Sequence, residues 1–174
     1  MKVVTEAKTK EEALKKALDE LKVNENEIFY KEESIKGKLF KSGSIKIYAY
    51  TDDEILESIK KFITEIVTNM GLEVNFETNI RDRQFNLKMF SNNNAILIGK
   101  NARTMKAIEM LARQKIQVEY GIRVRIFLDV ENYNEKRIKQ LERLAITTAK
   151  EVSRSKIEVA LDSMNSYERI IIHY

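Results

Sequence analysis

Apolar residues recur at strand or helix spacing over most of the chain, and capping signals mark where elements begin. A short strand is predicted at Val3–Val4, and Thr9 lies three residues before Glu12, a capping-box spacing that predicts a helix ending at Leu21. Two further strands are predicted over residues 27–33 and 44–50, with a loop between Gly37 and Gly43. A βαββ unit of about 50 residues buries little core by itself, so we expect a small appendage or a dimerising element.

The middle of the chain shows a second series of periodic segments. Apolar residues at helical spacing from Ile55 to Met70 predict a helix of more than four turns, which Gly71 is well placed to end. The elements that follow are strands over 72–79 and 84–90, a short helix over 95–98, a longer helix after Gly99 and a strand over 124–128. The predicted order is therefore α-β-β-α-α-β.

The last part of the chain carries two more capping signals. Asn132 with Glu135 predicts the start of a long amphipathic helix, and an alternating strand is predicted over 157–161. The ending is ambiguous, because its β-branched run favours a strand, whereas Asn165 followed by Glu168 is a helix-start signature. We predict a helix there. The chain is thus expected to be an α+β protein of three small modules with the orders βαββ, α-β-β-α-α-β and α-β-α.

Composition narrows the function classes. The 174 residues are 43% apolar and 33% charged, which is typical of a soluble globular protein. The chain has no Cys and one His, which excludes a disulfide framework, thiolate catalysis and Cys-rich or His-rich metal sites. The longest apolar run is the four residues 95–98, and the N-terminus lacks the apolar region of a signal peptide. We therefore expect a cytoplasmic protein with no membrane insertion, no metal and no cofactor.

Charge is unevenly distributed along the sequence. Residues 51–82 carry eight acidic and three basic side chains, whereas residues 95–125 carry seven basic and two acidic ones. This layout favours a face for a polyanion that is kept apart from an acidic face. Charge runs are also common on solvated surfaces, so charge alone leaves both interpretations open.

The first candidate site lies where the short predicted helix meets the longer basic one. A glycine there would let a phosphodiester approach the main chain, and the amides that open the next helix would donate to phosphate. Basic side chains along the same path would add attraction. Taken alone, residues 98–103 are better interpreted as a tight turn with a solvated lysine. The candidate residues are Ile98, Gly99, Lys100, Asn101, Ala102, Arg103 and Lys106.

The second candidate site is Arg169 with His173, near the end of the chain. On a helix, residues four apart share one face, and Ser166 lies just ahead of the pair. A guanidinium beside an imidazole can hold a phosphate and stack on a base. For five residues taken alone, a chance pair is the better interpretation.

Context changes the interpretation of the first site. Over residues 52–130, the order α-β-β-α-α-β with I-G-K-N between its second and third helices resembles the prokaryotic, type II KH domain. In that family a Gly-x-x-Gly loop clamps the backbone of about four nucleotides, and an apolar groove holds their bases. The loop carries over as Gly99, Lys100, Asn101 and Ala102, with Ala in place of the second glycine. If that position needs a positive φ, Ala strains the loop by roughly 1 kcal/mol or more; if it opens the next helix, Ala is harmless.

Context changes the interpretation of the second site as well. The ending S-M-N-S-Y-E-R-I-I-I-H, behind a capped helix and a short strand, resembles the single-stranded nucleic-acid module named for its Arg-x-x-x-His signature. Arg169 and His173 match the signature, with Met164, Tyr167 and Glu168 in matching context. That family continues through more helix and a closing strand, so this copy is expected to be truncated.

The three modules together resemble the bacterial Jag family, also called KhpB. They comprise a Jag N-terminal domain at 1–50, a type II KH domain at 51–130 and an Arg-x-x-x-His domain at 131–174. The resemblance implies a cytoplasmic single-stranded RNA-binding protein, acting as an RNA chaperone or post-transcriptional regulator in cell elongation, cell-wall homeostasis and sporulation. It also implies a small stand-alone KH protein as partner, and the N-terminal module is a candidate for homodimerisation.

Two other functions compete with this one. No P-loop, dinucleotide fingerprint or nucleophile–His arrangement is present, and Asp52 or Asp53 is more readily a helix cap than part of a metal-dependent nuclease, so we expect no enzyme. A protein scaffold whose basic strip docks an acidic partner is the alternative. If RNA binds, its bases are expected in aliphatic pockets lined by Ile96, Ile98 and Ile108, with Tyr120 the nearest aromatic residue.

Overall fold

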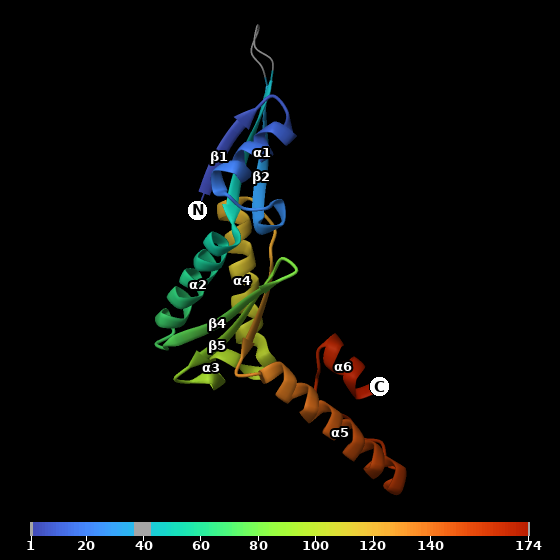
Figure 1. Ribbon diagram of the computed structural model, residues 1–174. Helices are drawn as coiled ribbons and strands as arrows, with labels where there is room; N and C mark the ends of the chain where they lie inside the picture. Colours follow the sequence, from blue (N-terminus) through green and yellow to red (C-terminus); the bar gives the residue numbers. More distant parts are fainter. Residues whose placement is uncertain (1, 37–42, 174) are drawn as a thin grey trace.

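The computed structural model describes residues 2–36 and 43–173, and it confirms an α+β fold built from two three-stranded sheets with helices packed against them (Figure 1). Most of the loop predicted between Gly37 and Gly43 lies outside the described residues. In the part of the chain that the structure describes, no helix combines the length and apolar character needed to cross a bilayer.

The N-terminal segment is a small sheet covered by one helix. Its elements are β1 (Lys2–Ala7), α1 (Lys10–Leu21), the 3-10 turn η1 (Glu25–Glu27), β2 (Ile28–Ile35) and β3 (Ser44–Thr51). The strands lie in the order β1-β3-β2 and are antiparallel. Thr9 caps α1 as predicted, because its hydroxyl oxygen accepts a hydrogen bond from the Glu12 amide at 3.3 Å. The core between helix and sheet is small, consisting of Val3, Ala13, Ala17, Ile28, Ile47 and Ala49.

The central segment has the predicted order of helices and strands, with one additional 3-10 turn. Its elements are α2 (Asp52–Asn69), β4 (Val74–Arg81), β5 (Gln84–Ser91), α3 (Asn94–Ile98), η2 (Lys100–Ala102), α4 (Arg103–Tyr120) and β6 (Arg125–Val130). The sheet has the order β4-β5-β6, in which β5 and β6 are parallel. Gly71, at φ 77°, follows the end of α2 as expected.

The N-terminal segment packs against the central segment and shares its hydrophobic core. Phe29 and Tyr50 are buried in the same cluster as the apolar residues of α2, α4 and the second sheet. The Tyr50 and Tyr120 rings meet edge to face, with centroids 4.8 Å apart. The expected appendage is therefore a docked element, held by residues on two of its three strands.

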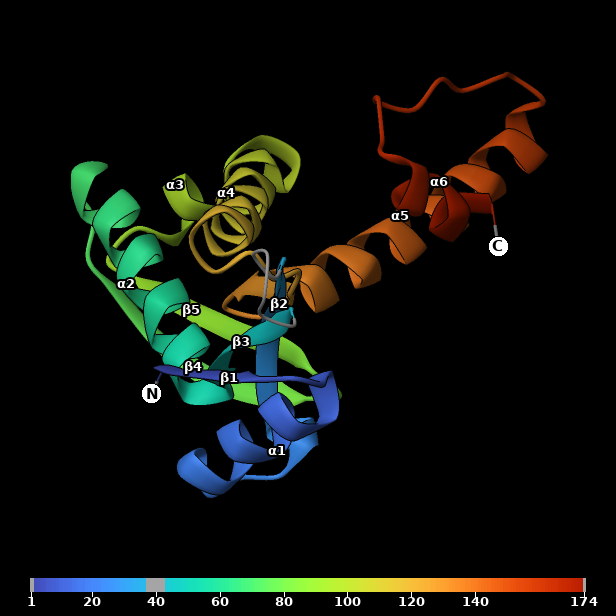
Figure 2. The same ribbon diagram turned by 90° about the horizontal axis from the view of Figure 1, so that it is seen from above.

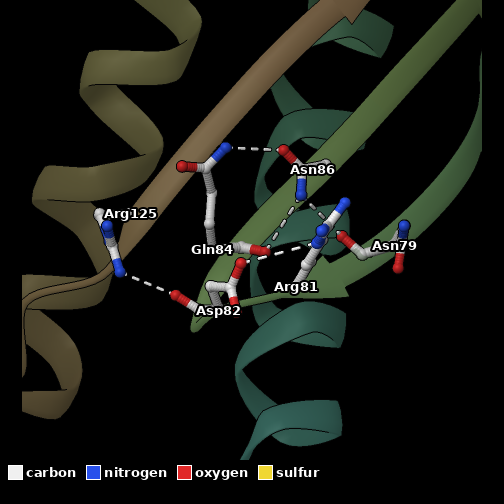
Figure 3. A network of polar contacts seen from close by, with 6 residues as sticks. All are labelled: Asn79, Arg81, Asp82, Gln84, Asn86 and Arg125. Carbon is white, nitrogen blue, oxygen red and sulfur yellow. Dashed lines mark hydrogen bonds and ion pairs between the residues drawn. The ribbon is translucent and has the colours of Figure 1, made fainter.

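A two-residue turn joins β4 to β5 and supports this docking. Asp82 and Arg83 both have positive φ values, 50° and 58°, as a type I′ hairpin turn requires. The Arg125 guanidinium donates to the Asp82 carbonyl at 2.7 Å, as Figure 3 shows. The Arg83 guanidinium donates to the Ile28 carbonyl at 2.8 Å and lies 4.4 Å from the centroid of the Phe29 ring. One side chain of the turn thus reaches the N-terminal sheet.

The cap of α2 differs from the prediction. Neither Asp52 nor Asp53 caps the helix; Thr51 does, and its hydroxyl accepts from the Glu54 amide at 3.4 Å. The two aspartates lie instead in the first turn, where a carboxylate interacts favourably with the helix dipole. The physical reason is that Thr51 ends β3 with extended backbone angles, which is the conformation of an N-cap residue.

The C-terminal segment consists of two helices, α5 (Tyr133–Ser155) and α6 (Ser166–His173), and α6 folds back beside α5 (Figures 1 and 2). The strand predicted over 157–161 is wrong, because these residues are neither strand nor helix. A single strand without a neighbour has no ladder of hydrogen bonds, and this stretch pairs with none of the described strands. The predicted C-terminal helix is confirmed.

The two capping signals of this segment have opposite outcomes. Asn165 and Glu168 form the predicted reciprocal pair, with the Glu168 amide donating to Asn165 Oδ1 at 3.0 Å and the Asn165 amide donating to Glu168 Oε2 at 3.1 Å. The Asn132 cap is wrong, because Asn132 has a left-handed backbone at φ 60° and makes no side-chain cap bond. Asp129 replaces it and accepts from the Asn134 amide at 3.2 Å.

Candidate nucleic-acid interface

The loop of residues 98–103, between α3 and α4, holds the first candidate site. Three of the four residues 99–102 have positive φ values: Gly99 at 67°, Asn101 at 53° and Ala102 at 59°. This backbone turns the chain sharply from the end of α3 into α4. The loop is therefore a sharp turn with defined backbone angles, and it is not simply the first turn of α4.

Gly99 is required at its position for two reasons. Its positive φ favours glycine, and a Cβ there would lie 2.1 Å from Thr104 Oγ1 and 2.9 Å from Thr104 Cβ. Thr104 is in the first turn of α4, so relieving the clash would move the helix as well as a side chain. The glycine found from sequence thus fixes how closely the loop packs on α4.

The backbone angles of Ala102 decide whether alanine strains the loop, which the sequence left open. Its φ of 59° and ψ of 20° are left-handed, so it does not open the helix in an ordinary helical conformation. An L-residue with a Cβ pays roughly 1–2 kcal/mol in that region, a cost that a glycine would avoid. The side chain is also buried, with 4% of its surface exposed. Alanine at this position strains the loop.

Not all amides of the loop face outward. The Gly99 amide donates to the Ala95 carbonyl at 2.9 Å, the Ala102 amide to Gly99 at 3.3 Å, and the Arg103 amide to Lys100. Among the described residues, the amides of Lys100 and Asn101 make no hydrogen bond within the chain. Two amides at the tip of the turn are therefore left for an external acceptor, fewer than the sequence suggested.

The basic side chains near the loop are exposed and differ from Arg113 and Lys115 of the same helix. Farther along α4, Arg113 and Lys115 form ion pairs with glutamates one turn away, at 2.9 and 2.6 Å. Lys100, Arg103 and Lys106 are all exposed. None of them forms an ion pair with a carboxylate of the described chain. The loop and the first turn of α4 thus carry three exposed positive charges that form no ion pair within the described chain.

A cavity of about 370 Å³, here called the junction cavity, adjoins the loop. Its lining includes Asn101, Ala102 and Lys106 from the loop and α4, and Phe127 from β6. The residues on the helical side are Tyr133, Asn134, Arg137, Ile138, Leu141, Asn165, Tyr167, Glu168 and Ile171. The fold therefore places the loop opposite α5 and α6, which sequence order alone did not indicate.

A buried ion pair holds the helical wall of this cavity together. Arg137 Nε donates to Glu168 Oε1 at 2.8 Å, and only 7% of the Glu168 side-chain surface is exposed. Burial by itself would raise the pKa of Glu168, but hydrogen bonds from Arg137 and the Asn165 amide, with the charges of Arg137 and Lys106, lower that pKa below its ordinary value. Lys106 on α4 is close enough to act on this carboxylate.

Arg169 and His173 lie on α6 but face a different cavity. They line a separate hollow of about 280 Å³ together with residues 161–164 and Ile172. Arg169 is held by its own segment, because it donates to the Met164 carbonyl at 3.0 Å and to the Ser166 hydroxyl at 3.2 Å. The two candidate sites are therefore not brought together in one cavity, although both are on exposed surface.

The expected aliphatic base pockets need correction. Ile108 is only 3% exposed and belongs to the central core, so it is not available to a ligand, whereas Ile96 is 47% exposed. Tyr120 is also unavailable, since its ring packs on Tyr50. The aromatic residues near the loop are Phe127, Tyr133 and Tyr167, of which sequence reasoning missed Phe127 and Tyr133. The sequence signal for Tyr167 was its matching context within the Arg-x-x-x-His pattern.

Comparison with known proteins gives a consistent set of relatives. The chain is 33% identical over 176 residues to the RNA-binding protein KhpB of Clostridium symbiosum, covering 98% of this chain and 79% of that protein. It is 30% identical over 122 residues to the RNA-binding protein KhpB of Lactiplantibacillus plantarum, and 39% identical over 79 residues to that of Bacillus subtilis. These two alignments cover 70% and 45% of this chain and 38% of each relative.

Two other comparisons add little. No protein-family model matches the chain. A solved structure of the Aquifex aeolicus Era protein, a variant bound to GDP and aluminium fluoride, aligns over 44% of this chain and 29% of that one, at 20% identity and a TM-score of 0.28. A similarity that low carries no argument about this fold.

Proposed function

This chain belongs to the KhpB family, also called Jag, and from that premise we propose that it binds single-stranded RNA at the loop between α3 and α4. The observation that carries the proposal is the loop itself. The amides of Lys100 and Asn101, which have no acceptor within the described chain, lie in a sharp turn beside three exposed basic side chains that no carboxylate in the described chain pairs with. Such a turn suits the phosphodiester backbone of a nucleic acid.

The binding mode follows from the chemistry of these groups. The outward amides donate to phosphate oxygens, and Lys100, Arg103 and Lys106 contribute charge along the path that continues onto α4. None of these contacts reads a base edge, so we expect weak sequence preference. Single strands are expected to bind better than duplex, because stacking and pocket contacts need unpaired bases. We further propose that Arg169 and His173 form a secondary contact.

Some parts of the proposal rest on the family resemblance alone. These are a role as an RNA chaperone or post-transcriptional regulator, the links to cell elongation, the cell wall and sporulation, and the small stand-alone KH protein as partner. The proposed division into domains at 1–50, 51–130 and 131–174 rests on periodicity as well. We also propose that the chain is not an enzyme, since its named relatives are RNA-binding proteins. Labelled RNA incubated with the protein and Mg²⁺ should stay intact.

The proposal is tested by reversing charge at the tip of the loop. Replacing Lys100 and Asn101 with Asp should lower the affinity for a single-stranded RNA about ten-fold or more, because phosphate then meets two carboxylates. Both side chains are exposed, so the fold should be unchanged. The matched control is Lys15→Asp with Asn26→Asp, the same change of charge at exposed positions of the N-terminal segment. Affinities are measured by fluorescence anisotropy with a labelled oligonucleotide.

A salt titration of the unmodified protein separates RNA binding from the alternative scaffold function. Three phosphate contacts predict a slope of about −2 for the logarithm of affinity against the logarithm of salt concentration, at roughly −0.7 per contact with a single strand. Equal affinities of the loop variant and the control variant would move the site away from the loop. Absence of any RNA binding, together with binding of an acidic protein that the loop variant loses, would favour the scaffold.

A further inference from the structure

We infer that the junction cavity between the loop and the C-terminal helices is a base-binding pocket, which takes one unpaired nucleobase of an RNA whose backbone lies on the loop. The inference rests on the proposed function and extends it to a second part of the molecule. It assigns a binding role to the walls formed by α5 and α6, apart from Arg169 and His173.

The position of the cavity links it to the loop. Asn101 and Ala102 belong both to the turn and to the wall of the cavity, and Lys106 lines it from the first turns of α4. A phosphate held at the Asn101 amide therefore has its own nucleotide within reach of the cavity. The separate hollow lined by Arg169 and His173 includes no residue of the loop.

The size of the cavity fits one nucleotide. At about 370 Å³ it lies near the lower end of the range of small-molecule sites, roughly 300–1,000 Å³. A duplex cannot enter such a space, and a helix of a partner protein would need a longer groove. The cavity thus selects for an unstacked base, which only a single strand or a splayed-out loop provides.

The lining supplies aromatic surface for stacking. Phe127 is 43% exposed and Tyr167 is 61% exposed, and Tyr133 is half-buried on the neighbouring wall. Large exposed aromatic rings that line a cavity beside unpaired basic side chains are typical of single-stranded nucleic-acid sites, because every base has a face that can stack. An acidic peptide would use the charges but would leave these rings uncovered.

The polar groups of the lining suit the edge of a base. Arg137 binds Glu168 through Nε. The two terminal nitrogens of the Arg137 guanidinium have no acceptor in the described chain. The side-chain amide nitrogen of Asn165 also has no acceptor in the described chain. The side-chain oxygen of Asn165 accepts a hydrogen bond from the Glu168 amide. These donors match the oxygen and nitrogen acceptors that bases present. The Arg137–Glu168 pair itself positions α6 and is not assigned to the ligand.

The test uses Tyr167, whose exposure makes a folding defect on truncation small. Tyr167→Ala should weaken binding of an eight-nucleotide oligouridylate by roughly five- to 150-fold, the effect of losing one base–aromatic stack. Tyr167→Phe keeps the ring and should stay within about two-fold of the unmodified chain. The matched control is Ile170→Ala, on the same helix, 55% exposed and outside the lining of both C-terminal cavities.

The outcomes separate this inference from the proposed function. If the unmodified protein binds no oligouridylate, the proposed function fails. If Lys100→Asp with Asn101→Asp abolishes binding but Tyr167→Ala binds as tightly as Ile170→Ala, the proposed function stands and the pocket is overturned. Photo-crosslinking of 5-iodouridine RNA to the unmodified protein, followed by mass spectrometry, needs no variant. Attachment at Tyr167, Tyr133 or Phe127 supports the pocket, and attachment only elsewhere overturns it.

Discussion

At the scale of single residues, the loop shows how a glycine and an alanine that both have a positive φ have different physical consequences. Gly99 could be identified from the sequence because the order of elements around it resembles that of a type II KH domain. Ala102 could not, because a left-handed alanine has no local signal and its conformation follows from how α3 and α4 pack. The same holds for Asp82 and Arg83, a left-handed pair without the glycine that usually marks a type I′ turn.

The strain at Ala102 leads to a stability prediction. Ala102→Gly should raise the free energy of unfolding by roughly 0.5–1 kcal/mol, since relief of the left-handed penalty exceeds the extra chain entropy of glycine. Urea denaturation checks this. Gly99→Ala is the matched opposite change and should destabilise the protein, because its Cβ meets Thr104. A loss of stability in Ala102→Gly would show that packing of the buried methyl group outweighs the strain.

At the scale of elements, α6 depends on contacts that lie both near and far in the sequence. Its Asn165–Glu168 capping pair could be predicted, since the two residues are three apart. The Arg137 partner of Glu168 is 31 residues away, and no periodicity points to it. The mistaken strand at 157–161 has the same origin, because alternation predicts a strand only where another strand is available to pair with it.

The Glu168 carboxylate makes the docking of α6 dependent on pH. Its pKa is lowered from the ordinary 4.5 in the folded protein, so its stabilising contribution is complete above that value and is lost as the pH falls through the folded pKa. Acidification should therefore release α6 from α5 before the central segment unfolds. NMR spectra of α6 amides during a pH titration check this. Glu168→Gln should weaken the docking at neutral pH and remove the acid step; an unchanged acid step would contradict the assignment.

At the scale of the whole molecule, the N-terminal sheet and the proposed RNA site lie at opposite ends of the central segment (Figure 1). The α+β class and most element bounds could be predicted from periodicity. The docking could not, because Phe29 and Tyr50 read as ordinary strand residues and their place in the central core appears only in three dimensions. The same limit applies to the junction cavity, whose walls come from residues 101–106 and 127–171.

This separation predicts that docking and binding can be altered independently. Arg83→Ala removes the hydrogen bond to the Ile28 carbonyl and the contact with the Phe29 ring, and should lower the free energy of unfolding by roughly 1–2 kcal/mol. RNA affinity should not change. The control is Arg81→Ala on the same hairpin, where the only recorded ion pair is an exposed one with Asp82. Differential scanning calorimetry and RNA titrations check both, and equal melting temperatures for the two variants would contradict the role of Arg83.

The junction between β6 and α5 has one more consequence. Glu131 and Asn132, both left-handed, are the only residues between the strand that carries Phe127 and the helix that carries Tyr133 and Arg137. Any rotation about these two residues changes the distance between the opposite walls of the junction cavity. A nucleotide that contacts both walls would hold them at a fixed distance. Binding of a single nucleotide would therefore fix the angle between β6 and α5.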